Sequence, residues 1–128
     1  MSTQRSSRPA RRTRQRPEAG AALAWAVAAC EERKAVDGLV LDLRHLSDAA
    51  DHFVVVSGTS DTHVRAIAEH VIEALRDHGV RVHHVEGLAQ GRWVLLDFVD
   101  FVVHVFHPTL RAFYQLEGLW GDAPRRAV

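Results

Sequence analysis

This chain of 128 residues lacks a pair of cysteines, has no apolar run long enough to cross a membrane, and has a formal net charge of zero. The single cysteine, Cys30, cannot form a disulfide within the chain, which favours a reducing compartment. No apolar run approaches the roughly 20 residues of a membrane-spanning helix, and no apolar segment follows the arginine-rich start as a secretory signal requires. With 47% hydrophobic and 25% charged residues, the sequence predicts one domain of a cytoplasmic globular protein.

The formal net charge of zero conceals an uneven distribution of charge along the chain. Residues 1–16 contain six arginines and no acid, so 10 of the 16 basic residues and all 16 acidic residues remain in the rest, whose net charge is −6. A basic segment without apolar periodicity is typical of a disordered tail, and we expect residues 1–17 to form one. Because arginine-rich arms also bind nucleic-acid phosphates, a phosphate contact by this tail stays an alternative.

Apolar periodicity and turn residues predict an alternation of helices and strands. Helices are expected over residues 18–34, from an N-cap at Thr59 or Ser60 to Gly79, and from Pro108 onward. Five strands are expected, over residues 39–43, 53–56, 80–85, 92–98 and 101–106. This order predicts an α/β fold in which a mixed sheet of about five strands is flanked by helices. The folded domain is expected over residues 18–122, followed by a frayed end at 123–128.

The last two predicted strands are so close in the chain that they must form a tight hairpin. A two-residue turn at Val99 and Asp100 pairs Phe98 with Phe101, Leu96 with Val103, and Val94 with Val105. Side chains alternate along a strand, so these six apolar residues share one face, which we assign to the core. The opposite face is mixed and comprises Trp93, Leu95, Asp97, Val102, His104 and Phe106. Two interpretations of the mixed face stay open: a helix covers it, or it is exposed and binds a protein partner.

The sequence contains none of the residue patterns of a metal centre or an active site. Its nine histidines are dispersed, and the adjacent His83 and His84 point to opposite faces of a strand. The segment from Val54 to Ser60 with the following helix is similar to the start of a nucleotidyltransferase, but that chemistry needs two acids spaced one residue apart, and no such pair exists. Asp51-His52 lacks the nucleophile motif of a hydrolase. We therefore expect no catalytic residue, no metal and no cofactor.

Several collinear motifs together resemble the ribosomal silencing factor family, also called RsfS or Iojap. They are Leu39-Val40-Leu41-Asp42-Leu43, the segment from Gly58 to Ala68, Val85-Glu86-Gly87-Leu88, the segments from Gly91 to Asp97 and from Val102 to Phe106, and the ending Phe113-Tyr114-Gln115-Leu116-Glu117 with Leu119-Trp120-Gly121-Asp122. The resemblance covers about residues 20–123, which is nearly all of the expected folded part.

The resemblance implies a nucleotidyltransferase-like fold without the catalytic acids, in a protein that is not an enzyme. It implies binding to ribosomal protein fourteen of the large ribosomal subunit, where the bound protein sterically blocks joining with the small subunit and represses translation when nutrients are scarce. The family's tryptophan corresponds to Trp93, which favours the exposed interpretation of the mixed face. The expected partner-binding residues are Trp93, Leu95, Asp97, His104 and Phe106. Contacts of the N-terminal arginines with ribosomal RNA and a homodimer of the free protein are further hypotheses.

Two features depart from the family pattern. The family has Gly-Asp at the hairpin turn, where this chain has Val99-Asp100, and a β-branched residue at positive φ is strained. Either the turn is of another type or the loop is longer. The arginine-rich residues 1–16 lie outside the resemblance. A nucleotide-handling enzyme and a scaffold unrelated to ribosomes are the competing hypotheses from other classes.

Overall fold

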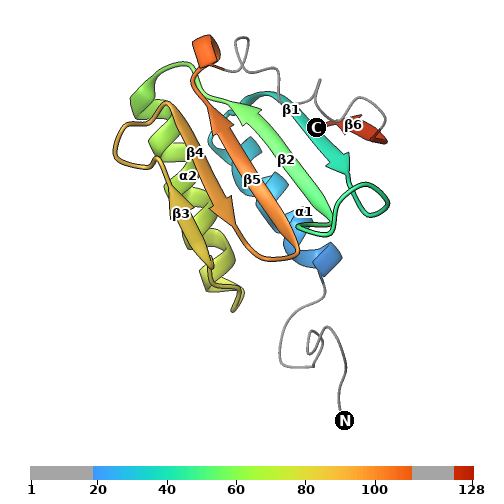
Figure 1. Cartoon of the computed structure of the whole chain (residues 1–128). Coiled ribbons are helices and arrows are strands. Elements are labelled where there is room, and N and C mark those ends of the chain that lie inside the picture. The colour runs from blue at the N-terminus through green and yellow to red at the C-terminus, as the bar shows by residue number, and fades with distance from the viewer. Residues whose placement is uncertain (1–18, 111–122) are drawn as a thin grey trace.

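The computed structural model describes residues 19–110 and 123–128, which form two long helices and a six-stranded sheet (Figure 1). The elements are α1 (Ala19–Glu32), β1 (Val36–Asp42), β2 (His52–Ser57), α2 (Asp61–Asp77), β3 (His84–Glu86), β4 (Trp93–Asp97), β5 (Phe101–Phe106) and β6 (Arg125–Ala127). The strand order is β3-β4-β5-β2-β1-β6, and only β2 and β5 pair in parallel. The predicted α/β fold with a mixed sheet is confirmed, with six strands in place of about five.

Both long helices pack on the same face of the sheet, behind it in the view of Figure 1. The buried stripe of α2 is the one its periodicity predicts: Val64, Ile67, Ala68, Val71 and Leu75. On α1, Leu23 and Cys30 are buried, and Val27 is partly buried. Three alanines, Ala22, Ala26 and Ala29, complete the buried face of α1. Because these side chains are small, α1 contributes little apolar volume and the sheet residues provide most of the core.

The connection from β2 to α2 has a structural role, as its sequence predicts. Ser60 is the N-cap, and its side-chain oxygen accepts a hydrogen bond from the backbone N–H of His63 at 3.1 Å. A Cβ at Gly58 would lie 2.9 Å from the backbone nitrogen of Val64, so a larger residue requires a shift of the helix start. The His63 ring contacts the carbonyl oxygen of Arg33 at 2.7 Å and so joins the start of α2 to the turn after α1.

The β4–β5 hairpin has the predicted register. Leu96 pairs with Val103, Val94 pairs with Val105, and the six residues assigned to the core face are all buried. The backbone N–H of Phe98 donates to the carbonyl of Phe101 at 2.9 Å, which leaves a two-residue turn. This register places Trp93 on the face opposite the core, as the alternation of side chains predicts.

Val99, at the tip of this hairpin, is strained. Its φ is 77°, and the backbone N–H of Asp100 donates to the carbonyl of Phe98 at 2.9 Å, which closes a three-residue turn. The N–H of Val99 donates to the Asp97 carboxylate at 2.8 Å. The turn thus keeps the length of a Gly-Asp hairpin, and a left-handed β-branched residue costs about 1 kcal/mol or more.

Two predicted segments are corrected by the structure. The strand expected over residues 80–85 is found at His84–Glu86, because only these three residues pair with β4. Residues 123–128, expected to fray, include β6, whose residues 125–127 pair with β1. The expected tail at 1–17 lies outside the described residues, and the helix expected from Pro108 is described only to Leu110.

Candidate partner-binding face

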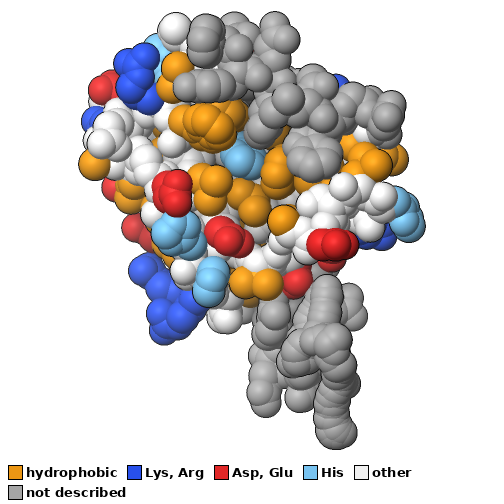
Figure 2. Space-filling model, viewed as in Figure 1, with side chains coloured by type: hydrophobic (Ala, Val, Ile, Leu, Met, Phe, Trp, Pro, Cys, Tyr) orange, Lys and Arg blue, Asp and Glu red, His pale blue; other side chains and the backbone are white. Residues whose placement is uncertain are grey.

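The face of the sheet opposite α1 and α2 carries the mixed side of the hairpin. We call it the β4–β5 face, and it comprises Trp93, Leu95, Asp97, Val102, His104 and Phe106. Figure 2 views this side of the molecule and shows hydrophobic side chains across the sheet, with acidic side chains and histidines beside them. Neither α1 nor α2 packs on it, since both belong to the apolar cluster on the other side. The structure therefore brings the five expected partner-binding residues together.

On the β4–β5 face, the three side chains of β4 are partly exposed, whereas two of the three side chains of β5 are buried. Trp93, Leu95 and Asp97, on β4, are partly exposed. On β5, His104 and Phe106 have exposed fractions of only 4% and 0%. A partner that approaches this face would meet the β4 side chains directly, and the two β5 residues would support them from beneath.

Trp93 is held by two neighbours on β5. Its ring stacks on Phe106, with the ring centroids 4.9 Å apart and the planes at 26°. Its indole N–H donates to Nδ1 of His104 at 3.1 Å. Such contacts fix the orientation of a large amphipathic side chain whose surface is still partly accessible, which is the property of an aromatic interface anchor.

The contact with Trp93 selects the tautomer of His104, and burial keeps its ring neutral. An indole nitrogen can only donate, so Nδ1 of His104 accepts and Nε2 carries the proton of the neutral ring. Nε2 is buried and has no hydrogen-bond acceptor among residues 19–110 and 123–128. Burial lowers the pKa of His104 to about 4, so the ring is neutral at pH 7. A buried donor without an acceptor costs about 1–3 kcal/mol, which marks His104 as a strained part of this face.

The loop before β4 requires glycine and determines where that strand begins. Gly87 and Gly91 bound this loop with φ values of 80° and 68°. A Cβ at Gly87 would lie 2.0 Å from the carbonyl oxygen of Trp93, which no side chain can tolerate. The glycines of the loop thus let the chain turn directly onto the strand that carries Trp93.

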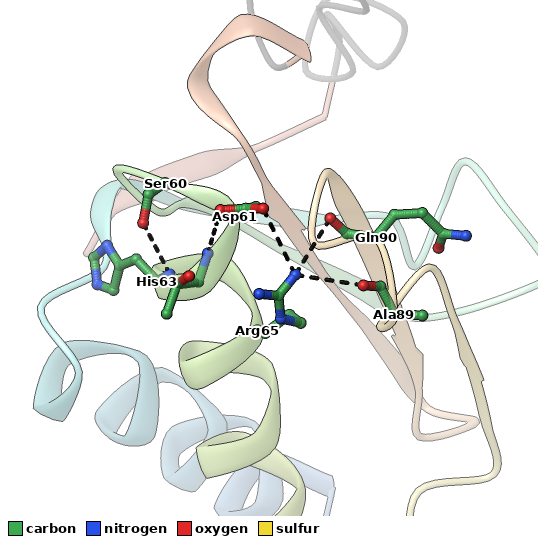
Figure 3. Close-up of polar contacts among 7 residues, drawn as sticks. Ser60, Asp61, His63, Arg65, Ala89 and Gln90 are labelled. Atoms are coloured by element: carbon green, nitrogen blue, oxygen red, sulfur yellow. Dashed lines mark hydrogen bonds and ion pairs between the residues drawn. The ribbon is translucent and has the colours of Figure 1, made fainter.

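Arg65 connects this loop to the start of α2. Its guanidinium Nη1 donates to the carbonyl oxygens of Ala89 and Gln90 at 3.4 and 3.5 Å (Figure 3). The same nitrogen lies 3.8 Å from the carboxylate of Asp61, one helical turn earlier. These contacts are long and partly exposed, so they orient the loop more than they stabilise the fold.

The described part of the chain offers little for metal or thiol chemistry. Residues 19–110 and 123–128 contain no group of three or more His, Cys, Asp or Glu side chains arranged to hold a metal ion. Burial raises the pKa of the Cys30 thiol to about 12, so it is protonated and unreactive. In the same ranges, no helix has the length and apolar character needed to cross a membrane.

Comparison with known proteins identifies the family of this chain. The sequence matches the family described as "Ribosomal silencing factor during starvation" over residues 16–128. The chain belongs to this family, RsfS. The ribosomal silencing factor RsfS of Bacillus subtilis is 46% identical over 99 residues, which cover 77% of this chain and 84% of that protein.

Structural similarity agrees with membership of the RsfS family. A crystal structure of a protein from Chromobacterium violaceum is 36% identical and superposes with a TM-score of 0.80, over 82% of this chain and 88% of that one. A more distant mouse protein, named "Mitochondrial assembly of ribosomal large subunit protein 1", is 33% identical over 73 residues, which cover 55% of this chain and 32% of that protein. The fold agrees with that of the bacterial crystal structure, and ribosome-related names recur among the bacterial and mitochondrial relatives.

The β4–β5 face extends beyond the hairpin, onto residues of β1 and β2 that the sequence pattern did not indicate. Leu41, Phe53 and Val55 pack in the same apolar cluster as Phe106. Phe53 also meets the edge of the His104 ring, with 4.5 Å between ring centroids. The alternation of side chains along β2 indicates that Phe53 and Val55 face away from the helices. The position of β2 beside β5 is a long-range pairing, which the local sequence pattern does not encode.

Proposed function

We propose that this RsfS-family protein binds the large ribosomal subunit and prevents it from joining the small subunit, which represses translation when nutrients are limiting. The names of the relatives support a ribosome-related role, as a ribosomal silencing factor in Bacillus subtilis and a large-subunit assembly protein in mouse mitochondria. Blocking by occupation needs a surface and no chemistry, so the proposed action is that of a binding protein rather than an enzyme.

The β4–β5 face is the surface that we propose for this contact, with ribosomal protein fourteen of the large subunit as the partner. The observation that carries the proposal is the partly exposed Trp93 ring, held by Phe106 and His104 on a face without α1 or α2. A preoriented aromatic side chain loses little conformational entropy on binding, which favours it as an anchor. Leu95 and Asp97 flank it with apolar and charged contact area.

The surroundings of Asp42 support a binding role over nucleotide chemistry. Arg44 donates to both carboxylate oxygens of Asp42, from Nε at 2.9 Å and from Nη2 at 2.6 Å. These hydrogen bonds hold the pKa of Asp42 well below its ordinary range. A carboxylate that is paired on both oxygens is poorly placed to bind a catalytic metal, and the sequence has no second acid two positions away.

The proposed function is tested by the order in which the protein meets the ribosomal subunits. Added to separated subunits, the protein should slow and reduce their joining, because the docking surface is already occupied. Added to preformed ribosomes, it should have a much smaller effect, because the small subunit occupies the same surface. Light scattering on one preparation of subunits measures both cases.

The two orders of addition also distinguish steric blocking from its alternatives. The absence of inhibition in both orders would contradict the proposed function. Equal inhibition in both orders would contradict simple steric blocking and indicate active splitting of ribosomes. Glu73→Gln, on the exposed side of α2, is a suitable control, and this variant should inhibit as the unchanged protein does.

A further inference from the structure

A pocket of about 270 Å³ lies at one end of the sheet, away from the β4–β5 face. Its lining comes from the end of β1, the start of β2 and the residues entering β6: Val40, Asp42, Arg44, His52, Pro124, Arg125 and Arg126. The side chains of Asp42 and His52 point to the helix side, because each stands two residues from a core residue on that side, Val40 or Val54. The pocket is therefore separate from the proposed ribosome contact, and neither proposal depends on the other.

The residues that line this pocket have a net positive charge, whereas the chain outside residues 1–16 has a net negative charge. Three of its lining residues are arginines and one is an acid, which gives +2 with a neutral histidine. Outside residues 1–16, the chain as a whole has a net charge of −6. A concentration of guanidinium groups in an acidic domain is the arrangement expected where an anion binds.

One of the arginines is already oriented for such a ligand. Arg44 uses Nε and Nη2 to bind the Asp42 carboxylate, which leaves its Nη1 donors available. The Arg44 side chain is 58% exposed, so a ligand can reach those donors. Arg126, exposed on β6, forms no ion pair with residues 19–110 or 123–128 and adds a second guanidinium.

His52 adds a neutral hydrogen-bonding group beside the two guanidiniums. It pairs with Asp42 across β1 and β2 and is partly buried. Burial lowers the pKa of His52, so the ring is neutral at pH 7 and has one donor and one acceptor nitrogen. The pocket thus combines planar guanidinium donors with a neutral imidazole that can donate one hydrogen bond.

We propose that this pocket binds a phosphate group, with Arg44, Arg126 and His52 as its ligands. Guanidinium groups match the oxygen geometry of phosphate and form charge-assisted hydrogen bonds with it. The phosphate can come from an RNA backbone or from a free phosphate compound, and both present the same oxygens. Asp42 orients Arg44 and does not contact the phosphate.

The position of the pocket favours an RNA backbone as the source. The chain enters β1 through a short turn after α1, so α1 runs antiparallel to β1. The two have similar lengths, about 21 and 23 Å at standard rises, so the start of α1 lies near the level of the end of β1, as Figure 1 shows. The six arginines of residues 1–16 thus join the chain at the end of the sheet that holds the pocket.

The test follows the ring signals of His52 by NMR in the full chain while inorganic phosphate or a short RNA is added. Millimolar phosphate should shift the His52 signals, and Arg126→Gln should weaken this binding about fivefold by removing one charged contact. If RNA displaces the phosphate and binds more weakly to Arg126→Gln, its backbone is the source. If RNA leaves the phosphate in place, a free phosphate compound is the ligand.

Arg81→Gln is the matched control, because Arg81 is also exposed and lies near β3, at the opposite edge of the sheet. It removes the same charge and should leave phosphate binding unchanged. Equal weakening by the two variants would overturn the proposal, since it would indicate a general effect of charge. Unshifted His52 signals at millimolar phosphate would also overturn it. A circular dichroism melt of each variant verifies that both remain folded.

Discussion

Replacing Trp93 by alanine should lower the affinity for the large ribosomal subunit about 30-fold, because an aromatic anchor contributes about 2 kcal/mol or more at an interface. The variant should keep its fold. It loses the stacking on Phe106 and the hydrogen bond to His104, which are on the side of the sheet away from the helices. We expect a moderate fall in stability, on the order of 1–2 kcal/mol. Affinity is measured by co-sedimentation well below the melting temperature of the variant.

Phe98→Ala separates loss of an anchor from loss of stability. Phe98 is buried at 3% exposure and stacks on Phe101 with centroids 5.1 Å apart. Its truncation should cost about 3–5 kcal/mol of folding stability, while the molecules that remain folded still bind the subunit. A Trp93→Ala protein that is stable and binds with unchanged affinity would show that the contact surface lies elsewhere.

Acidification should destabilise the protein through His104. Burial lowers the pKa of this histidine from 6.5 to about 4 in the folded state, so the unfolded chain binds the proton more tightly. The stability contributed by the neutral ring is complete above pH 6.5 and is lost as the pH falls to about 4, a change of about 3 kcal/mol. Urea unfolding at a series of pH values between 7 and 4 measures it.

His104→Phe tests the source of this pH dependence. Phenylalanine keeps a flat ring on the face and cannot be protonated. Most of the loss of about 3 kcal/mol in folding stability between pH 6.5 and 4 should therefore be absent in this variant. His45→Gln, which changes an exposed histidine in the loop after β1, is the control and should retain the full dependence. An unchanged pH profile in His104→Phe would mean that other groups control acid unfolding.

The hairpin shows how far local pattern predicts this molecule. Alternation of side chains and a two-residue turn were enough to place Val94 and Leu96 in the core and Trp93 on the opposite face. The turn type was not predictable, because Val99 adopts a positive φ that its own side chain disfavours. That conformation depends on hydrogen bonds that the Asp97 carboxylate and the Phe98 carbonyl accept, which are properties of the closed hairpin.

The parts that could not be predicted depend on contacts between distant segments. The strand β6 is short and contains Arg125 and Arg126, so its own pattern does not indicate a strand, and it forms only because β1 offers an open edge. The pocket at that end of the sheet also depends on this pairing, because Pro124, Arg125 and Arg126 form part of its lining. The burial of His104 likewise follows from the parallel pairing of β2 with β5, which brings Phe53 against its ring.

The central claim is that the chain binds the large ribosomal subunit, and co-sedimentation with each isolated subunit tests it most directly. The purified full chain is mixed with large or small subunits and centrifuged, and the protein in each pellet is measured at near-physiological salt. The account predicts that the protein pellets with large subunits, in a ratio that saturates near one per subunit, and stays in solution with small subunits. A protein that pellets with neither subunit, or equally with both, would contradict it.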